Sequence, residues 1–298
     1  MPVHQRPFLA LGLRLAAAFC MSSLYMLVKL VHEMGVSLPE IMFWRQAGAL
    51  PLLLIWLLAS GQMWQLRTTR IKSHAVRSAM GMAGMLANFG ATILLPLAVA
   101  TILGFTTPLF AVLLSALVLK EHIGPWRWLA VALGFVGVLV IARPGAMTIA
   151  PLGALVGLAS GLMVAIVSIQ LRDMGRTETP LSVVFYFSVF GTALMLPVLP
   201  FFYTPHTPFQ WMVILGMGAV GTLAQVLLTA ALRYGPVSSV VVMDYSALIW
   251  TTFYGWLVFR QLPPDSTWWG APLVVAAGLV ITWREHVRHR EAARTPLA

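Results

Sequence analysis

The sequence predicts an all-α polytopic membrane protein in which ten transmembrane helices form two inverted five-helix repeats. Three observations lead to this fold class: an apolar composition, ten apolar segments of membrane-spanning length, and a stretch of the first half that recurs in the second. Hydrophobic residues make up 59% of the 298 residues and charged residues 9%, with a mean hydropathy of +0.87. Soluble globular chains carry about 25% charged residues, so a water-soluble domain is excluded.

The first five segments run near 8–31, 40–60, 77–97, 100–119 and 126–142. Each is close to the roughly 20 residues that an α-helix needs to span the hydrocarbon core. The stretches HEMGVSLP, GQMWQLRTTRIKSH and KEHIGP separate them with turn residues or charge, whereas only Pro96 separates the third from the fourth. The first segment is too long for the apolar core of a cleaved signal peptide, so we expect it to be the first transmembrane helix.

The second five segments run near 151–171, 180–202, 209–232, 236–259 and 268–283, after the break RPGAMTIAP. Between them lie RDMGRTET, YTPHTP, RYGP and RQLPPDST, and each of these stretches contains proline, glycine or charge. They bring the predicted number of crossings to ten.

A duplication is visible directly in the sequence. Residues 117–141 (LVLKEHIGPWRWLAVALGFVGVLVI) return without a gap as residues 257–281 (LVFRQLPPDSTWWGAPLVVAAGLVI), and seven of the 25 positions are identical. The two copies are 140 residues apart, and Asn88 and Gln225 are separated by nearly the same distance in sequence, 137 residues. Five crossings per half is an odd number, so the second half must insert upside down relative to the first, as in many carriers. The predicted repeats are residues 1–145 and residues 146–298, the second ending in a basic tail.

Lys and Arg residues predict the orientation, because basic residues are retained on the cytoplasmic side. Placing the N-terminus inside assigns 15 of 19 to that side: Arg6, Arg14, Arg67, Arg70, Lys72, Arg77, Lys120, Arg127, Arg172, Arg176, Arg233, Arg284, Arg288, Arg290 and Arg294. The four exceptions are Lys29, Arg45, Arg143 and Arg260. Both termini are therefore predicted to be cytoplasmic.

The sequence also excludes several classes of function. No GxxxxGK(S/T) loop is present to hold ATP phosphates, and no HExxH pattern or carboxylate pair offers metal or acid–base catalysis. Cys20 is the single cysteine, which excludes an internal disulfide and a cysteine metal cluster. The net charge of +10 comes from basic residues that lie between apolar runs rather than beside stacking aromatics, which argues against nucleic acid as a partner. We expect neither enzymatic activity nor a cofactor.

Two stretches of the first half resemble a known family. Residues 23–46 (SLYMLVKLVHEMGVSLPEIMFWRQ) resemble the opening of an EamA-type domain, and residues 106–145 (TTPLFAVLLSALVLKEHIGPWRWLAVALGFVGVLVIARPG) resemble its close. The second copy departs from the pattern at Gln261, where glutamate is usual, and at Leu248, where Pro108 would predict proline. The chain is identified as a tandem EamA-type member of the drug/metabolite transporter superfamily, most similar to bacterial exporters of amino acids, including aromatic ones.

This resemblance implies a secondary transporter in the bacterial inner membrane that exports small metabolites by alternating access. The expected substrates are amino acids with aromatic or apolar side chains, transported with either narrow or broad specificity. The alternative is a multidrug or other metabolite carrier. A pore or a membrane scaffold fits less well, because the polar residues are scattered and the loops are short. The expected partners are the lipid bilayer and the small-molecule substrate, and coupling to protons is left open.

Lys29 and Arg45 also resemble family positions, near the outer side of the membrane. We expect them to lock the first two helices together through Glu33 or Glu40. The alternative is that they attract a substrate carboxylate.

Polar residues midway along apolar segments are the first candidates for a substrate site, since inverted-repeat carriers bind near the bilayer midplane. Asn88 and Gln225 stand at matching depths and are predicted to hydrogen-bond a zwitterion, with helix–helix bonding as the alternative. Asp244 is the only acidic residue deep in an apolar segment. It is a candidate to receive a substrate ammonium group or a coupling proton, and the alternative is a structural pair with Arg14 or Arg233.

Aromatic and hydroxyl side chains at similar depth complete the candidate substrate site. The aromatic candidates are Tyr25, Phe105, Tyr245 and Trp250, which offer apolar surface to a bulky side chain, although such residues also mark membrane interfaces. Ser22 and Thr106 offer hydroxyl groups, and the alternative for each is a bond to a carbonyl one turn earlier in its own helix.

Overall fold

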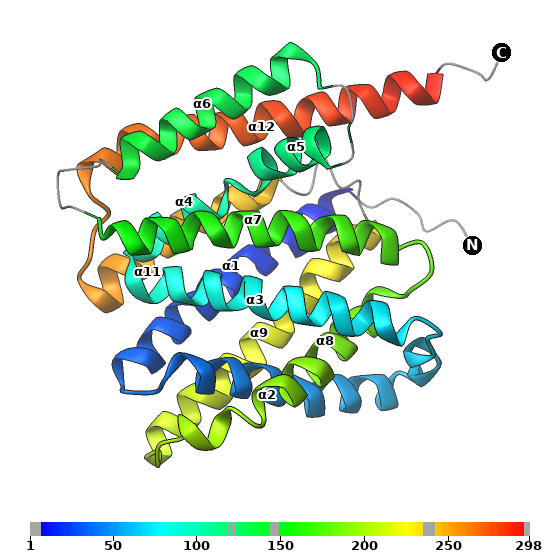
Figure 1. Cartoon of the computed structure of the whole chain (residues 1–298). Coiled ribbons are helices and arrows are strands. Elements are labelled where there is room, and N and C mark those ends of the chain that lie inside the picture. The colour runs from blue at the N-terminus through cyan, green and yellow to red at the C-terminus, as the bar shows by residue number, and fades with distance from the viewer. Residues whose placement is uncertain (1–6, 119, 121–122, 143–148, 235–241, 295–298) are drawn as a thin grey trace.

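The computed structural model describes residues 7–118, 120, 123–142, 149–234 and 242–294, and every regular element within these ranges is a helix (Figure 1). The first half contains α1 (Pro7–Glu33), α2 (Leu38–Ala59), η1 (Met63–Leu66), α3 (Ile71–Leu94), α4 (Leu97–Gly104), α5 (Thr107–Leu117) and α6 (Pro125–Ala142). The second half contains α7 (Pro151–Met174), α8 (Pro180–Met195), η2 (Leu199–Phe201), α9 (Pro208–Tyr234), η3 (Val242–Ser246), α11 (Ala247–Phe259) and α12 (Asp265–Arg294).

Seven helical stretches in the described ranges are long and apolar enough to cross a membrane. They are Phe8–Glu33, Leu38–Ala59, Leu97–Leu117, Pro125–Ala142, Pro151–Met174, Pro208–Leu228 and Asp265–Arg284. The predicted all-helical, multi-pass membrane fold is confirmed at this level. The boundary predicted at Pro96 is present as well, since α3 ends at Leu94 and α4 begins at Leu97. Proline disfavours the helical conformation in the residue before it, and Leu95 is extended.

One predicted helix, near 100–119, is interrupted. α4 ends at Gly104, and α5 begins at Thr107. Pro108 explains the break, because proline has no N–H to donate to the carbonyl four residues earlier. That carbonyl belongs to Gly104, and the hydroxyl of Thr107 donates to it instead at 2.8 Å.

The second half has a similar irregularity 140 positions later. The 3-10 helix η3 precedes α11, which begins at Ala247. The hydroxyl of Ser246 donates to the carbonyl of Met243 at 2.6 Å, just as Thr106 donates to Leu103 at 2.5 Å. Residues 235–241 of the predicted segment 236–259 lie outside the described residues, as does Glu121. Lys120 and Arg260, also 140 residues apart, both have a φ angle of 53°.

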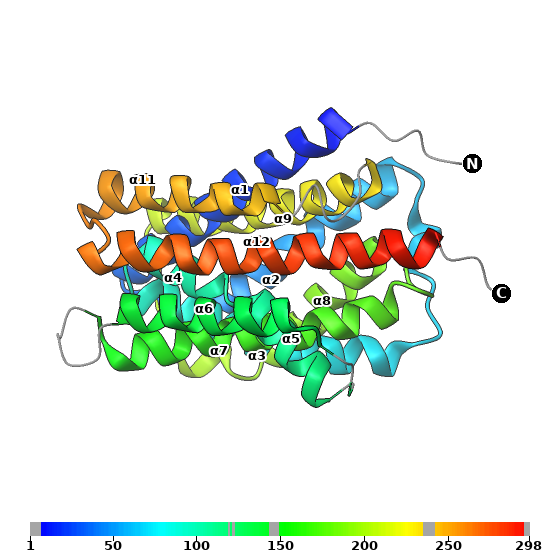
Figure 2. The same cartoon turned by 90° about the horizontal axis from the view of Figure 1, so that it is seen from above.

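The helix contacts relate the two halves of the chain. α1 packs along α9 and α7 along α3; α2 contacts α9, and α8 contacts α3; α11 contacts α1, and α5 contacts α7. α6 and α12 lie side by side in both views, and Figure 1 shows them along one edge of the bundle (Figure 1, Figure 2). Thus, for each of these contacts between a helix of the first half and a helix of the second half, the corresponding pair related by the repeat is also in contact.

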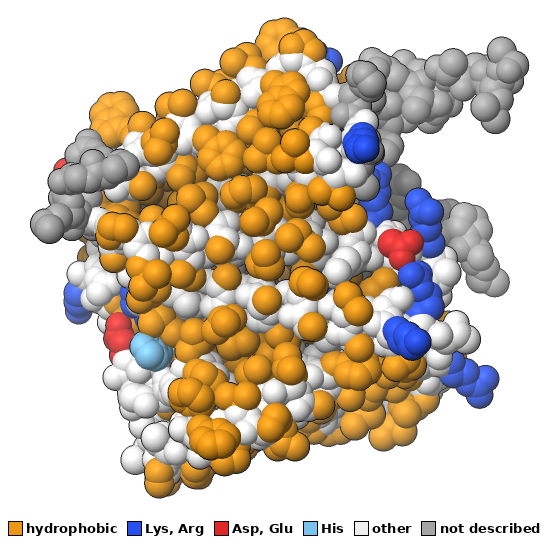
Figure 3. Space-filling model, in the orientation of Figure 1, with side chains coloured by type: hydrophobic (Ala, Val, Ile, Leu, Met, Phe, Trp, Pro, Cys, Tyr) orange, Lys and Arg blue, Asp and Glu red, His pale blue; other side chains and the backbone are white. Residues whose placement is uncertain are grey.

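The outer surface of the bundle is largely apolar. Leu155, Leu215 and Ile249 are among the large apolar side chains on this surface, each at least 60% exposed. Figure 3 shows hydrophobic side chains over most of the visible face, with the visible Lys and Arg side chains mainly at one edge. This edge, which we call the basic end, is where α1 begins and α12 ends (Figure 1). Apolar surface on this scale is suited to lipid contact rather than to water.

Glu40, near the start of α2, does not pair with Arg45. Nε2 of His206 donates to its Oε1 at 2.6 Å, both side chains are fully buried, and Trp44 donates to the same oxygen at 3.2 Å. The predicted lock between Arg45 and Glu40 is therefore wrong. Five residues separate the two on one helix, so they point about 140° apart around it.

Lys29 also lacks the predicted carboxylate contact. Its Nζ donates to the backbone carbonyl of Leu95 at 2.8 Å and to Oε1 of Gln261 at 3.1 Å, and it lies 5.3 Å from the centre of the Phe259 ring. These acceptors are neutral, and they connect α1 with the end of α3 and with the loop after α11.

A second buried His–Glu pair lies at the basic end. His74 in the first turn of α3 pairs with Glu178 in the loop before α8, at 3.0 Å between Nε2 and Oε2. Burial by itself raises the pKa of Glu178, but hydrogen bonds from His74, Thr68 and Ser182 together hold that pKa below its usual range. The pair connects the two halves at the end opposite to that of Glu40 and His206.

Candidate functional site

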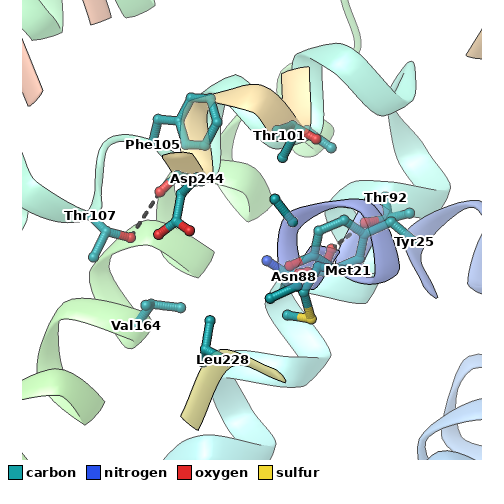
Figure 4. A pocket seen from close by; sticks show the side chains of 15 residues that line it. Met21, Tyr25, Asn88, Thr92, Thr101, Phe105, Thr107, Val164, Leu228 and Asp244 are labelled. Atoms are coloured by element: carbon teal, nitrogen blue, oxygen red, sulfur yellow. Dashed lines mark hydrogen bonds between the residues drawn. The ribbon is translucent and has the colours of Figure 1, made fainter. Parts of the chain in front are cut away.

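A cavity of about 200 Å³ lies at the centre of the bundle, where α1, α3, α4 and η3 meet α7 and α9. Drug-sized ligands occupy pockets of about 300–1,000 Å³, so this space suits a small metabolite. Its lining residues are Ala17, Ala18, Met21, Tyr25, Asn88, Thr92, Ala100, Thr101, Gly104, Phe105, Thr107, Val164, Leu228, Asp244 and Ala247. Figure 4 shows how the larger of these side chains surround it.

Four of the nine predicted site residues line this cavity: Tyr25, Asn88, Phe105 and Asp244. They come from four separate places in the chain: α1, α3, the junction of α4 and α5, and η3. Tyr245 lies next to them, because its ring packs edge-on against Phe105 with 4.8 Å between ring centres. The structure therefore brings five of the nine together at one place.

Asp244 projects into the cavity from η3 and forms an ion pair with Arg14 of α1. Nε of Arg14 donates to Oδ1 and Nη2 donates to Oδ2, each at 2.5 Å. The Arg14 side chain is only 8% exposed, whereas that of Asp244 is 35% exposed. One of the two partners predicted for a structural pair is thus in place, and the carboxylate still faces the cavity.

Tyr25 and Asn88 form a polar wall across the cavity from Asp244 (Figure 4). The Thr92 hydroxyl donates to the backbone carbonyl of Asn88 at 2.9 Å, so it serves its own helix. The apolar side chains of Val164, on the side of Asp244, Met21, beside Asn88, and Leu228, between them, also line the cavity. The cavity can therefore hold a molecule with polar groups at opposite ends and an apolar body.

The other four predicted site residues lie elsewhere. Ser22 is fully buried and donates to the carbonyls of Ala18 (2.9 Å) and Ala247 (3.3 Å), and Thr106 donates to Leu103. These hydroxyls satisfy backbone groups, as the alternative interpretation had it.

Gln225 and Trp250 also lie outside the lining residues. Gln225 is half-buried in α9, and Trp250 packs edge-on against Phe19 with 4.9 Å between ring centres. Gln225 has the depth predicted by the repeat but does not reach the cavity, because depth alone does not determine which face of a helix carries a residue.

Several lining residues carry no signal in the sequence. Met21, Val164 and Leu228 are apolar residues among many in apolar helices. Only the packing of α9 against α1 and of α7 against α3 and α4 selects them. Within the described residues, no group of three or more His, Cys, Asp or Glu side chains is arranged to hold a metal ion.

Comparison with known proteins gives a consistent family. The EamA-like transporter family matches residues 8–143 and 151–283. A pseudopaline exporter of Pseudomonas aeruginosa is 32% identical over 276 residues, which cover 91% of this chain and 94% of the exporter.

More distant relatives are named for other substrates. A riboflavin transporter of Vibrio cholerae is 28% identical over 87% of this chain and 88% of its own length. An S-adenosylmethionine uptake transporter of Rickettsia prowazekii is 26% identical over 74% of each chain. A solved crystal structure with 22% identity superposes with a TM-score of 0.60, covering 92% of this chain and 96% of its own, which shows a common fold.

Proposed function

The chain belongs to the EamA-like transporter family, and from this premise we propose that it exports small, amino-acid-like metabolites across the bacterial inner membrane by alternating access. Its relatives are membrane transporters of small molecules rather than enzymes. The observation that carries the proposal is the central cavity, which has a carboxylate on one wall and amide and phenol groups on the other.

Asp244 would receive the ammonium group of the substrate. Each of its oxygens accepts one hydrogen bond from Arg14, which leaves lone pairs on the cavity side. Asn88 and Tyr25 would bind the polar group at the other end of the molecule. The apolar surface of Phe105, with Met21 and Val164, would hold the side chain, in keeping with an aromatic or apolar amino acid.

We also propose ten crossings in two inverted repeats, residues 1–145 and 146–298. The exchanged helix contacts support this architecture, as do the matching hydroxyl-to-carbonyl bonds of Thr106 and Ser246. Irregular helices that line a central cavity in both halves are common in inverted-repeat carriers. The basic end of the bundle supports an orientation with both termini in the cytoplasm.

A counterflow assay tests the function. Purified protein in liposomes preloaded with one unlabelled compound is expected to accumulate labelled phenylalanine or another amino acid, whereas empty liposomes are not. The panel should include riboflavin, a sugar and a cationic dye, since some relatives are named for substrates other than amino acids. If no amino acid is exchanged, the amino-acid assignment fails, and exchange of riboflavin alone would favour a carrier of other metabolites.

Replacing Asn88 with alanine is expected to raise the apparent transport constant by about tenfold, the equivalent of roughly 1.4 kcal/mol, because one hydrogen bond to the substrate is lost. Gln225→Ala is the matched control, since Gln225 is an amide in an equivalent helix that does not line the cavity. Saturation curves for equal amounts of monodisperse protein measure both. Unchanged transport by the Asn88→Ala protein would show that Asn88 acts in helix packing rather than in substrate binding.

A further inference from the structure

A second group of polar residues lies inside the bundle, outside the lining of the cavity. It consists of Arg45 and Gln46 on α2 and Arg77 on α3, and we call it the cation cluster. Nη1 of Arg45 donates to Oε1 of Gln46 at 2.5 Å, and Gln46 Nε2 donates to the carbonyl of Phe187 at 3.2 Å. The guanidinium of Arg77 lies over the ring of Phe187, 4.1 Å from its centre. Gln46 and Arg77 therefore both contact Phe187 of α8, and Arg45 is joined to them through Gln46.

The charges in this cluster have no acidic partner among the described residues. Arg45 is only 5% exposed, and Gln46 is completely buried. Nε and Nη1 of Arg77 are buried and make no hydrogen bond. The described acidic groups of the interior are bound elsewhere: Asp244 to Arg14, Glu40 to His206 and Glu178 to His74.

Glycines on neighbouring turns make room for these polar groups. A Cβ atom on Gly191 of α8 would lie 2.5 Å from Nε2 of Gln46, and one on Gly81 would lie 3.0 Å from Nη1 of Arg77. A Cβ on Gly221 of α9 would lie 3.5 Å from Nε of Arg45. The bundle thus accommodates the cluster within its packing.

The physical argument is one of charge. Buried charges are normally paired, because removing an ion from water costs several kcal/mol. The buried guanidinium of Arg45 and the buried Nε and Nη1 of the half-buried Arg77 have no carboxylate partner among the described residues, which indicates that an anion completes the site. An amino acid with one carboxylate is neutral overall, and Arg14 already balances Asp244. A substrate must bring additional negative charge to balance Arg45 and Arg77.

The position of the cluster relates it to the transport path. Arg45 and Leu24 both approach Gly221, and Leu24 precedes Tyr25, which lines the cavity. Along α3, Arg77 is about 9 Å from the first residue, at the basic end, and Asn88 is about 25 Å from it, at 1.5 Å per residue. The cluster therefore extends from the side of the basic end towards the cavity.

We propose that Arg45 and Arg77 form an anion-binding subsite for a second carboxylate of the transported metabolite, with Gln46 holding the guanidinium of Arg45 in place. The preferred substrates would then be acidic metabolites that carry one amino group and at least two carboxylates. This inference rests on the proposed export of amino-acid-like compounds and changes the expected substrates from aromatic or apolar to acidic ones.

Thermal unfolding of the full chain in a neutral detergent tests the subsite without requiring transport. L-Glutamate and L-glutamine form a matched pair, since they differ by one carboxylate. At equal ionic strength, glutamate is expected to raise Tm at a concentration about tenfold lower than glutamine, as one charge-assisted hydrogen bond would give. Inorganic phosphate serves as a third probe. A shift from phosphate but none from glutamate would overturn the carboxylate assignment.

Variants of Arg77 separate binding from folding. Arg77→Met is expected to abolish the preference for glutamate and to raise Tm without ligand, because it removes an uncompensated buried charge while keeping an apolar side chain of similar length. Arg77→Lys should keep part of the preference. Arg70→Met is the matched control, since Arg70 lies at the start of the same helix and pairs with the exposed Asp173.

A lower Tm of ligand-free Arg77→Met together with an unchanged preference for glutamate would overturn the subsite and assign Arg77 to packing. If glutamate binds as expected but counterflow detects no amino acid, the subsite stands and the proposed function falls.

Discussion

Transport by the Asp244→Asn protein is expected to fall at least about a hundredfold. Asparagine cannot balance the charge of Arg14, whose side chain is 8% exposed. Removing one partner of a buried ion pair costs about 3–5 kcal/mol of stability, roughly two to four orders of magnitude in the folding equilibrium, and the 35% exposure of the Asp244 side chain lowers this cost. The variant also removes the one carboxylate among the described residues that line the cavity, so the ammonium group of a substrate loses its partner. Counterflow and the Tm of the purified variant measure the two effects separately.

Two further variants distinguish a structural pair from a binding site. The exchange variant, Arg14→Asp with Asp244→Arg, restores the charge balance but moves the carboxylate to α1. We expect it to recover Tm and not transport. Full recovery of transport would show that the pair acts only in packing.

Asp244 is also a candidate carrier of a coupling proton. If it has this role, residual transport by Asp244→Asn should no longer depend on pH. A dependence on pH equal to that of the unaltered protein would remove Asp244 from coupling and leave it as a substrate residue.

The second large effect is expected on stability, from substitution of Gly270, which lies against Gly137. They lie where α6 crosses α12, and a Cβ on Gly270 would lie 2.5 Å from the backbone oxygen of Gly137. A Cβ on Gly137 would lie 2.8 Å from the oxygen of Gly270. Backbone atoms cannot move aside as the end of a side chain can, so Gly270→Ala must separate the two helices. We expect a loss of about 1–3 kcal/mol, seen as a lower Tm, and no folded protein from Gly270→Leu.

Gly216 of α9 is the matched control, because a Cβ there has no neighbour within 4 Å. Gly216→Ala should keep or raise Tm, since alanine favours a helix by up to about 1 kcal/mol over glycine. Equal Tm values for the Gly270→Ala and Gly216→Ala proteins would show that the close contact between α6 and α12 does not determine stability.

Much of the helical fold could be predicted because its signals are local. Length and hydropathy marked the helices, and Pro96 was sufficient to separate α3 from α4. The sequence does not predict the break after Gly104, because the apolar run continues through Pro108. In the structure, the hydroxyl of Thr107 donates to the carbonyl of Gly104 that Pro108 leaves free, and this bond marks the break.

The candidate site could be predicted only in part. Asp244 stood out because a carboxylate in an apolar segment needs a partner or a cavity, and the structure supplies both. Asn88 reaches the cavity and Gln225 does not, although the repeat places them at equivalent depths. The partner of Gln46 lies 141 residues away, and no local pattern indicates it.

The sequence by itself determined that this chain is a multi-pass helical membrane protein, that its halves are related, and to which family it belongs. These properties depend on composition, segment length and neighbouring residues, all of which are local. Only the tertiary structure decided which polar side chains share a cavity, which satisfy their own helix, and which charges have no carboxylate partner within the part of the chain that it describes. Those outcomes depend on how each helix is rotated about its axis and on contacts between residues far apart in the chain, and hydropathy does not encode either.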